Sequence, residues 1–426
     1  MIRLLHISDI HFKAPYCLDE RIDRDSRIRD LIMRDAKDFV TKTDIPVSAI
    51  LVTGDIAFKA SPEEFSKASE WLKKLAKEVG ADLENVYVVP GNHDVNRGTG
   101  DKFNVKAVRN EILSSNGEAR VGTFLNALQD QDASNALMEP FSAYNEFSAQ
   151  YECSISPNKP FWQNSIPFCP RYKLILNGLT STFFSGSNDA KPNLYMGEFQ
   201  ANLNISDGEI NLAMFHHPYD WLEDGDKVED YLTNRSQIRL VGHKHRQRAV
   251  SDHNGVLFSA AAANPERNEQ GYEPGYNILD LSISENDDSA LLSISAHLRV
   301  LQNMPEIFLP KMKTATKDVW EYEFEIPLSK IKVEEIPPLR IDKAEVKDKI
   351  DEAPLAQDGT HRSLVYRFWN IAESARRDII GQLNLLAGDE KALHRLDKYE
   401  IALENVVIFE LKDKFIELIE AAEGLK

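Results

Sequence analysis

With 426 residues, 42% of them hydrophobic, the chain is long enough for two domains with substantial cores. Its formal net charge of −18 disfavours indiscriminate binding to the phosphate backbone of nucleic acids, which depends on Lys and Arg, and its three scattered cysteines argue against a thiolate zinc site or a disulfide framework. The N-terminus lacks the apolar core of a signal peptide, and no apolar run approaches the ~18 residues that span a bilayer, so we expect a soluble, cytoplasmic protein without membrane contact.

The first hundred residues alternate between predicted strands and predicted helices. The apolar runs typical of buried strands are 2–8, 48–53 and 85–89, and the segments typical of helices are 25–43 and 62–79. Ser61 and Pro62 match the preferred N-cap and first position of the second helix. This alternation predicts a layered α/β domain.

Residues 96–170 interrupt that alternation. They contain three helix-like stretches, at 105–113, 121–128 and 140–151, and then a predicted loop rich in proline and aromatic residues, at 156–170. Because the insertion is longer than a simple connection and leaves directly from the loop at 91–94, we expect a helical lid beside the functional site. A scaffold insertion remote from the chemistry is the alternative.

Strands resume after the insertion. The predicted strands are 172–177, 209–215, 238–241, 247–251 and 256–260, and a closing hairpin is predicted from 275–282 and 291–297 with its turn at 286–288. Residues 305–342 contain five prolines and predict a linker or strap, with an extra strand at 319–326.

Residues 343–426 predict a small all-α domain. Apolar residues from Leu364 to Leu383 recur at helical spacing and predict one amphipathic helix, and two more helices are predicted at 391–404 and 407–421. We considered three roles for this domain: an adaptor for a protein partner, a self-association surface, and a cap that packs on the rest of the chain.

Five short motifs carry Asp, His or Asn directly after apolar runs that predict strands. They are Asp9-Ile10-His11, Gly54-Asp55, Gly91-Asn92-His93-Asp94, His216-His217-Pro218 and Gly242-His243-Lys244-His245. Open α/β sheets bind ligands at the carboxyl ends of their strands, so we expect these side chains to meet at one edge. Carboxylate, amide and imidazole ligands suit Mn²⁺, Fe or Zn²⁺ better than Ca²⁺.

Together, in this order, the five motifs resemble the pattern of the calcineurin-like metallophosphoesterases, over roughly residues 1–300. The resemblance implies two β-sheets packed as a sandwich and flanked by helices, in a domain at 1–304. It also implies two divalent metal ions, with Mn²⁺ preferred over Fe or Zn²⁺, and a metal-bridging hydroxide that attacks phosphorus. One ion would be held by Asp9, His11, Asp55 and His245, and the other by Asp55, Asn92, His216 and His243.

Four further residues are candidates for contact with the substrate. His93 follows a ligand and is a candidate to protonate the leaving oxygen, and Asp94 is a candidate to fix the tautomer of His93, with a loop-capping role as its alternative. Arg97 is a candidate substrate contact, and its alternative is an ordinary surface charge. His217 is also a candidate substrate contact, and its alternative is support of the metal ligands. Trp162 would stack on a base only if the insertion covers the site, and we expect it to pack instead.

The resulting function hypothesis is a phosphoesterase that hydrolyses phosphodiester bonds in a nucleotide or nucleic acid. One alternative is a DNA nuclease similar to the Mre11/SbcD group, which shares the ligand pattern. Another is a phosphatase effector that is recruited through residues 343–426 in a bacterial defence system.

Overall fold

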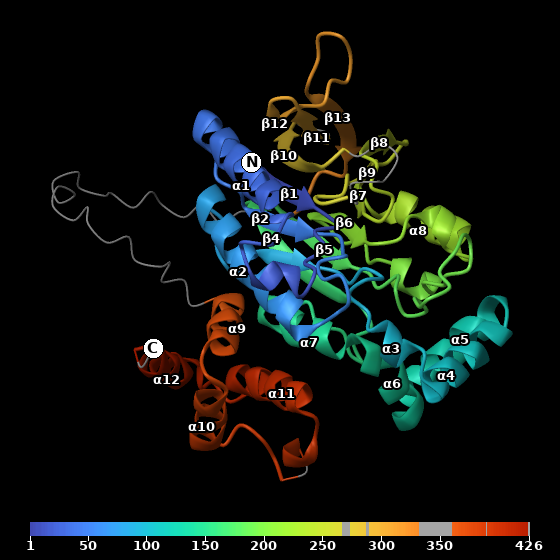
Figure 1. Ribbon diagram of the computed structural model, residues 1–426, viewed down its shortest axis with the longest axis vertical. Helices are drawn as coiled ribbons and strands as arrows, with labels where there is room; N and C mark the ends of the chain where they lie inside the picture. Colours follow the sequence, from blue (N-terminus) through green and yellow to red (C-terminus); the bar gives the residue numbers. More distant parts are fainter. Residues whose placement is uncertain (266–272, 287–288, 332–359, 389, 425–426) are drawn as a thin grey trace.

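Two β-sheets packed against each other form the centre of the protein (Figure 1). The computed structural model describes residues 1–265, 273–286, 289–331, 360–388 and 390–424. Within them, the first sheet has the order β12-β11-β10-β1-β2-β3, with β13 also paired to β11. Its strands are β1 (Ile2–Ile7), β2 (Ala49–Val52), β3 (Val86–Val88), β10 (Gly275–Glu285), β11 (Ala290–Asn303), β12 (Glu306–Pro310) and β13 (Trp320–Ile326).

The second sheet has the order β4-β5-β6-β7-β9-β8. Its strands are β4 (Trp162–Cys169), β5 (Tyr172–Gly178), β6 (Glu209–Phe215), β7 (Ile238–Val241), β8 (Arg248–Ser251) and β9 (Val256–Ser259). Each sheet contains a run of parallel strands, namely β1-β2-β3 and β5-β6-β7-β9. Parallel strands bring their carboxyl ends to a common edge, which is the edge that carries the five motifs.

The alternation of side chains along β6 explains the packing of the second sheet. Leu212 and Met214 join the core between the two sheets, whereas Ala213 and Phe215 face a second cluster beneath helix α8 (Gly225–Arg235). A strand buried on both faces reads as a continuous apolar run, as this one does. On the other side of the sandwich lie α1 (Ser26–Thr43) and α2 (Pro62–Val79), as Figure 1 shows.

Helix α2 begins where its sequence predicts. The Ser61 hydroxyl accepts a hydrogen bond from the Glu64 backbone N–H at 3.3 Å, and the Glu64 carboxylate accepts one from the Ser61 N–H at 3.2 Å. This capping box satisfies donors that the first turn of a helix leaves free. The helix ends at Gly80, whose φ of 72° is readily adopted only by glycine.

The insertion forms a helical subdomain, as predicted, but its last part belongs to the sheet. Its helices are α3 (Arg97–Gly100), α4 (Phe103–Ser114), α5 (Gly117–Gln129), α6 (Gln131–Met138) and α7 (Ser142–Ser148), with 3₁₀ turns η2 (Glu139–Phe141) and η3 (Ala149–Tyr151). The predicted loop at 156–170 is wrong over Trp162–Cys169, because β4 pairs with β5 there. Trp162 in β4 is buried and donates from its indole N–H to the Val88 carbonyl at 2.9 Å, so it packs as expected and does not stack on a base.

The predicted linker is wrong over its first part. Strands β12 and β13 both pair with β11 and extend the first sheet, so residues 306–326 belong to the sandwich. The predicted strand at 319–326 is confirmed as β13, and the predicted hairpin is confirmed as the antiparallel pair β10-β11. The remainder of the predicted linker and the centre of the hairpin turn lie outside the described residues.

The C-terminal helices have a core of their own. They are α9 (His361–Asn370), α10 (Glu373–Leu383), α11 (Arg395–Ile408) and α12 (Lys412–Glu423), packed around Phe368, Leu403 and Phe415. The single helix predicted from Leu364 to Leu383 is therefore wrong, because the backbone is extended at Ile371. None of the helices in the described residues combines the length and apolar character that a membrane crossing requires.

The C-terminal helices contact the α/β part directly, beside α2 and α7 (Figure 1). Arg362 and His361 pair with Glu152, and Arg395 pairs with Glu146. Tyr366 packs into the main hydrophobic core, where its ring centroid lies 6.1 Å from that of Tyr151. For the described part of this region, 360–388 and 390–424, these contacts are the arrangement expected of a cap that packs on the rest of the chain.

Candidate metal centre

Each of the five motifs follows the carboxyl end of a parallel strand. Asp9 and His11 follow β1, Asp55 follows β2 and Asn92 follows β3, while His216 follows β6 and the pair His243 and His245 follows β7. The structure therefore brings all seven predicted metal ligands to one edge of the sandwich, from both of its sheets. Five of them are buried, namely Asp9, His11, Asp55, Asn92 and His216.

The backbone at this edge is strained. Five of the seven candidate ligands have a positive φ, a conformation uncommon for residues other than glycine: Asp9 (55°), His11 (53°), Asp55 (53°), His243 (68°) and His245 (51°). Each such residue costs on the order of 1–3 kcal/mol, and such residues cluster at functional sites.

Two motif glycines allow the loops to approach one another. A Cβ on Gly91 would lie 2.1 Å from the Asp55 carboxylate and 2.2 Å from its backbone nitrogen. A Cβ on Gly54, whose φ is 90°, would lie 2.6 Å from Nδ1 of His216. The glycines are thus required by the contact between the loops after β2, β3 and β6.

One group of donor atoms lies around Asp9 and Asp55. Nε2 of His245 is 3.2 Å from Oδ1 of Asp9, and Nε2 of His11 is 3.3 Å from Oδ2 of Asp55. Donor atoms of Asp9, His11 and His245 all lie within 4.8 Å of one another, as do those of Asp9, Asp55 and His216. Distances of this size are compatible with neighbouring ligands of one small cation.

A second group lies around Asn92. Its Oδ1 is 3.1 Å from Nε2 of His216 and 3.1 Å from Nδ1 of His243, and these two nitrogens are 3.2 Å apart. Nε2 of His216 is also 3.4 Å from Oδ2 of Asp55. Asp55 therefore lies between the two groups, where a bridging carboxylate is required.

The ring orientations of two candidate ligands are fixed from behind. Nδ1 of His216 lies 2.8 Å from the Thr53 carbonyl, and Nδ1 of His11 lies 3.5 Å from the Asn264 carbonyl. Because a carbonyl oxygen only accepts, we assign a proton of each ring to Nδ1, which turns Nε2 toward the carboxylates. Metal-binding histidines are commonly held in this way.

The electrostatics of the cluster favour ionised carboxylates. Burial opposes the charge on Asp9, but the charges of His245 and His216 outweigh it and lower its pKa to about 2. For Asp55 burial is likewise outweighed, mainly by His216, and its pKa falls well below the usual range. Burial lowers the pKa of His243 to about 3, so its nitrogen lone pair is free at neutral pH.

These donor atoms fit divalent cations. Oxygen and nitrogen atoms face one another at 3.1–3.4 Å, and such atoms repel unless a proton or a cation lies between them. The donor set combines two carboxylates, one amide oxygen and four imidazoles, which is typical of sites for Mn²⁺, Fe or Zn²⁺.

His93 lies beside the donor atoms and is held by other contacts. Its Nδ1 is 2.9 Å from the Phe58 carbonyl, and its ring stacks on that of Phe58 with centroids 4.9 Å apart. Its backbone N–H donates to Oδ1 of Asp55 at 2.8 Å. Nε2 lies 3.4 Å from the guanidinium of Arg97, an exposed side chain. The two groups that we expected to contact the substrate are thus neighbours at the rim of the site.

The prediction that Asp94 fixes the tautomer of His93 is wrong. The Phe58 carbonyl takes that place, and the Asp94 carboxylate accepts the backbone N–H groups of Ile56, Ala57 and Gly91 at 3.2, 2.8 and 2.9 Å. Asp94 thereby ties the loop after β2 to the loop after β3, which is the loop-capping alternative. Burial and the nearby charge of Asp55 raise its pKa to about 7.

His217 does not have the position expected of a substrate contact. Its ring is fully buried beneath His216 and His243, so a substrate arriving from solvent does not meet it. Two aromatic residues at the site were not predicted from the sequence: the ring of Phe58 contacts His93, and the ring of Trp221 contacts His243. Both follow a metal motif within three to four residues, which is the sequence signal that could have identified them.

Comparisons with known proteins identify the family of the chain. The family model of calcineurin-like phosphoesterases matches residues 2–247. A metallophosphoesterase-like protein of Bacillus subtilis, YydB, is 25% identical over 260 residues, which cover 57% of this chain and 49% of that protein. The chain thus spans about half the length of this curated relative.

Similar solved structures include two proteins named Vps29. The one from Entamoeba histolytica is 10% identical with a TM-score of 0.30, and the alignment covers 76% of this chain and 99% of that chain. The one from Chaetomium thermophilum is 9% identical with a TM-score of 0.31, covering 77% and 100%. The family model, which spans more than half of the residues, shows that the chain belongs to the calcineurin-like phosphoesterases, a family of metal-dependent hydrolases.

Proposed function

We propose that this chain hydrolyses phosphodiester bonds of a nucleotide or nucleic acid with two divalent metal ions. The observation that carries the proposal is the convergence of seven nitrogen and oxygen donors from five loops, with the Asp55 carboxylate between two groups of them. One ion would be held by Asp9, His11, Asp55 and His245, and the other by Asp55, Asn92, His216 and His243.

When bound, two such ions lower the pKa of a water molecule and neutralise charge on the phosphoryl group. The residues of the chain supply the remaining requirements. Arg97 is exposed at the rim and places a positive charge where phosphoryl oxygens would lie, and His93 presents Nε2 at the same place. In the assigned tautomer the proton of His93 is on Nδ1, so it must gain a proton at Nε2 before it donates one to a leaving oxygen.

The charges around the site favour a small substrate over duplex DNA. The chain has a net charge of −18, and Lys244, next to two ligands, is paired with Asp220 at 2.6 Å. A duplex binds through many phosphate contacts to Lys and Arg, and each contact adds to the salt dependence of binding. We therefore place a nucleotide phosphodiester first and the Mre11/SbcD-like nuclease second.

A panel assay with Mn²⁺ tests the proposal. It compares a bis-nitrophenyl phosphodiester, cyclic nucleotides, single-stranded DNA and linear duplex DNA, each with the wild-type chain and with Asp55→Asn as the inactive control. We expect hydrolysis of the diester and of at least one nucleotide by the wild type only. Cleavage of duplex DNA alone would favour the nuclease, and hydrolysis that persists in Asp55→Asn would contradict the metal mechanism.

A further inference from the structure

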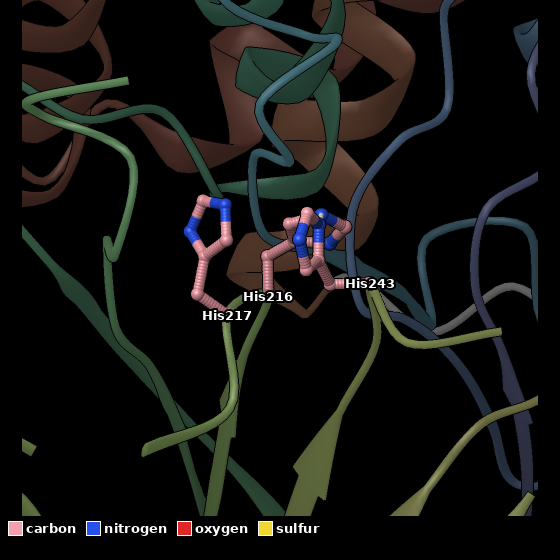
Figure 2. Close-up of side chains that lie close together, drawn as sticks. All are labelled: His216, His217 and His243. Carbon is pink, nitrogen blue, oxygen red and sulfur yellow. Dashed lines mark hydrogen bonds between the residues drawn. The ribbon is translucent and has the colours of Figure 1, made fainter. Parts of the chain in front are cut away.

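A third imidazole lies against the second group of donor atoms. The ring centroid of His217 is 4.8 Å from that of His216 and 4.6 Å from that of His243. Figure 2 shows the first two rings rising from the end of β6 and the third from the loop after β7. Trp221 stacks on His217 with centroids 6.1 Å apart and an interplanar angle of 29°, which holds the ring in place.

The hydrogen bonds of His217 fix its tautomer. Its Nδ1 lies 3.2 Å from the Ser181 carbonyl and 3.1 Å from the Ser181 hydroxyl, and that hydroxyl accepts the backbone N–H of His217 at 3.0 Å. A carbonyl oxygen only accepts, so the ring proton belongs on Nδ1 and the lone pair on Nε2. This is the arrangement by which Thr53 holds His216.

The Nε2 atom of His217 has no hydrogen-bond partner in the described part of the chain, although it is fully buried. Buried polar atoms without a partner are rare and call for an explanation such as a bound ion. In Figure 2 this nitrogen lies on the side of the ring that faces His216 and His243, and the other nitrogen lies on the far side. A ring nitrogen of each of the three residues lies within 4.8 Å of those of the other two.

That spacing is close to what one metal ion requires. Tetrahedral Zn–N bonds of about 2.0–2.1 Å place neighbouring ligand nitrogens about 3.4 Å apart, so nitrogens that lie within 4.8 Å of one another need to close by no more than about 1.4 Å. Burial excludes a direct contact with substrate, which leaves an ion beneath the surface as the partner that the geometry fits.

We propose that His217 is an additional ligand of the metal ion at Asn92, His216 and His243, and that it makes this position selective for Zn²⁺ or Fe over Mn²⁺. The proposal rests on the two-metal function proposed above. With His217, this position has three imidazoles, which suit Zn and Fe, whereas the position at Asp9 and Asp55 has two carboxylates, which suit Mn. The two positions would then prefer different metals.

A crystal structure of the wild-type chain grown with Zn²⁺, with anomalous data at the zinc edge, tests the ligand directly. We expect a zinc ion about 2.0–2.3 Å from Nε2 of His217. A zinc ion at Asn92, His216 and His243 with this nitrogen more than about 3 Å away would overturn the inference and leave the proposed function intact. Absence of any ion from both positions would instead count against the proposed function.

Metal competition tests the selectivity without an activity assay. Wild type, His217→Gln and His253→Gln, a matched change at an exposed histidine, are equilibrated with equal Mn²⁺ and Zn²⁺, and the bound metals are measured by mass spectrometry. We expect the ratio of bound zinc to bound manganese to fall at least about 10-fold in His217→Gln and to stay unchanged in His253→Gln. Removing a residue that only supports a metal ligand already lowers metal affinity about 10–100-fold, so about 10-fold is the lower limit for a ligand itself. An unchanged ratio in folded His217→Gln overturns the inference. If circular dichroism shows that this variant does not fold, the wild-type crystal decides.

Discussion

Arg362 is the residue through which the C-terminal helices are anchored most specifically. It lies at the start of α9, and its Nη2 donates to the Glu84 carbonyl at 2.5 Å. Its guanidinium lies 4.2 Å from the centroid of the Tyr87 ring and pairs with Glu152 at 3.4 Å. All three partners belong to the α/β part, so Arg362→Gln should loosen the attachment of α9–α12.

The size of the effect follows from these contacts. A hydrogen bond from a charged group contributes about 1.5–3 kcal/mol, a largely buried cation–π contact about 1–2 kcal/mol and a partly exposed ion pair less than about 1 kcal/mol. Because contributions of neighbouring contacts do not add fully, we expect Arg362→Gln to destabilise docking by about 3 kcal/mol. At about 1.4 kcal/mol per tenfold change, this is roughly a 100-fold shift of the docking equilibrium.

Amide hydrogen exchange measured by mass spectrometry reports this shift. Peptides from α9 and α10 should exchange roughly 100-fold faster in Arg362→Gln than in the wild type, if they exchange through undocking. Arg377→Gln, at an exposed arginine on α10, is the matched control and should exchange as the wild type does. Equal exchange in all three chains would refute the reasoning, and the C-terminal helices would not be held by the contacts described.

Three further predictions concern the metal site and the docking contact. Gly91→Ala should lower metal content, since its Cβ would lie 2.1 Å from the Asp55 carboxylate; elemental analysis checks this, and normal metal content would contradict it. His93→Gln should keep both ions but lower kcat by about 10²–10⁴-fold, measured on a nitrophenyl diester; equal loss of metal would show that His93 acts as a ligand. The pair His361–Glu152 should support docking most strongly between about pH 4.5 and 6.5. The hydrogen bond to Glu152 raises the pKa of His361, so the pair stops supporting docking as the pH rises through this raised pKa. Burial opposes ionisation of Glu152, but the contacts with His361 and Arg362 outweigh burial and lower the pKa of Glu152. The support is therefore also lost as the pH falls through the lowered pKa of Glu152. Hydrogen exchange of α9 across this range is the check, and a flat profile would refute it.

The parallel core could be predicted from the sequence because its strands are buried on both faces. The observed bounds of β6 and β7 are the predicted ones, and α2 begins at its predicted cap. Strand β4 was missed because it is an edge strand that contains Pro167, alternates between buried and exposed residues, and owes its pairing to β5. An edge strand of this kind has no continuous apolar run to reveal it.

The break between α9 and α10 was missed for a related reason. The helical spacing of apolar residues continues across Ile371, although the helix itself ends there. The end of α9 coincides with long-range hydrogen bonds of Asn370, whose side chain accepts from Lys73 at 2.6 Å and donates to Gln150 at 3.3 Å. Local periodicity does not contain such contacts.

The candidate ligands could be predicted because each motif directly follows a strand whose position is itself predictable. The partner of Asp94 could not, because the sequence does not show that three backbone N–H groups converge on its carboxylate. The contact of His217 with Ser181 was hidden likewise, since Ser181 reaches it from the loop after β5.

The metal content of the chain after equilibration with Mn²⁺ and removal of free ions tests the central claim most directly. The seven donors form two groups with the Asp55 carboxylate between them, so we predict two ions per wild-type chain. We predict fewer than two ions in Asp55→Asn, with its fold retained. A wild-type chain that retains no ion, or an Asp55→Asn chain that retains two ions as tightly as the wild type, would contradict the account.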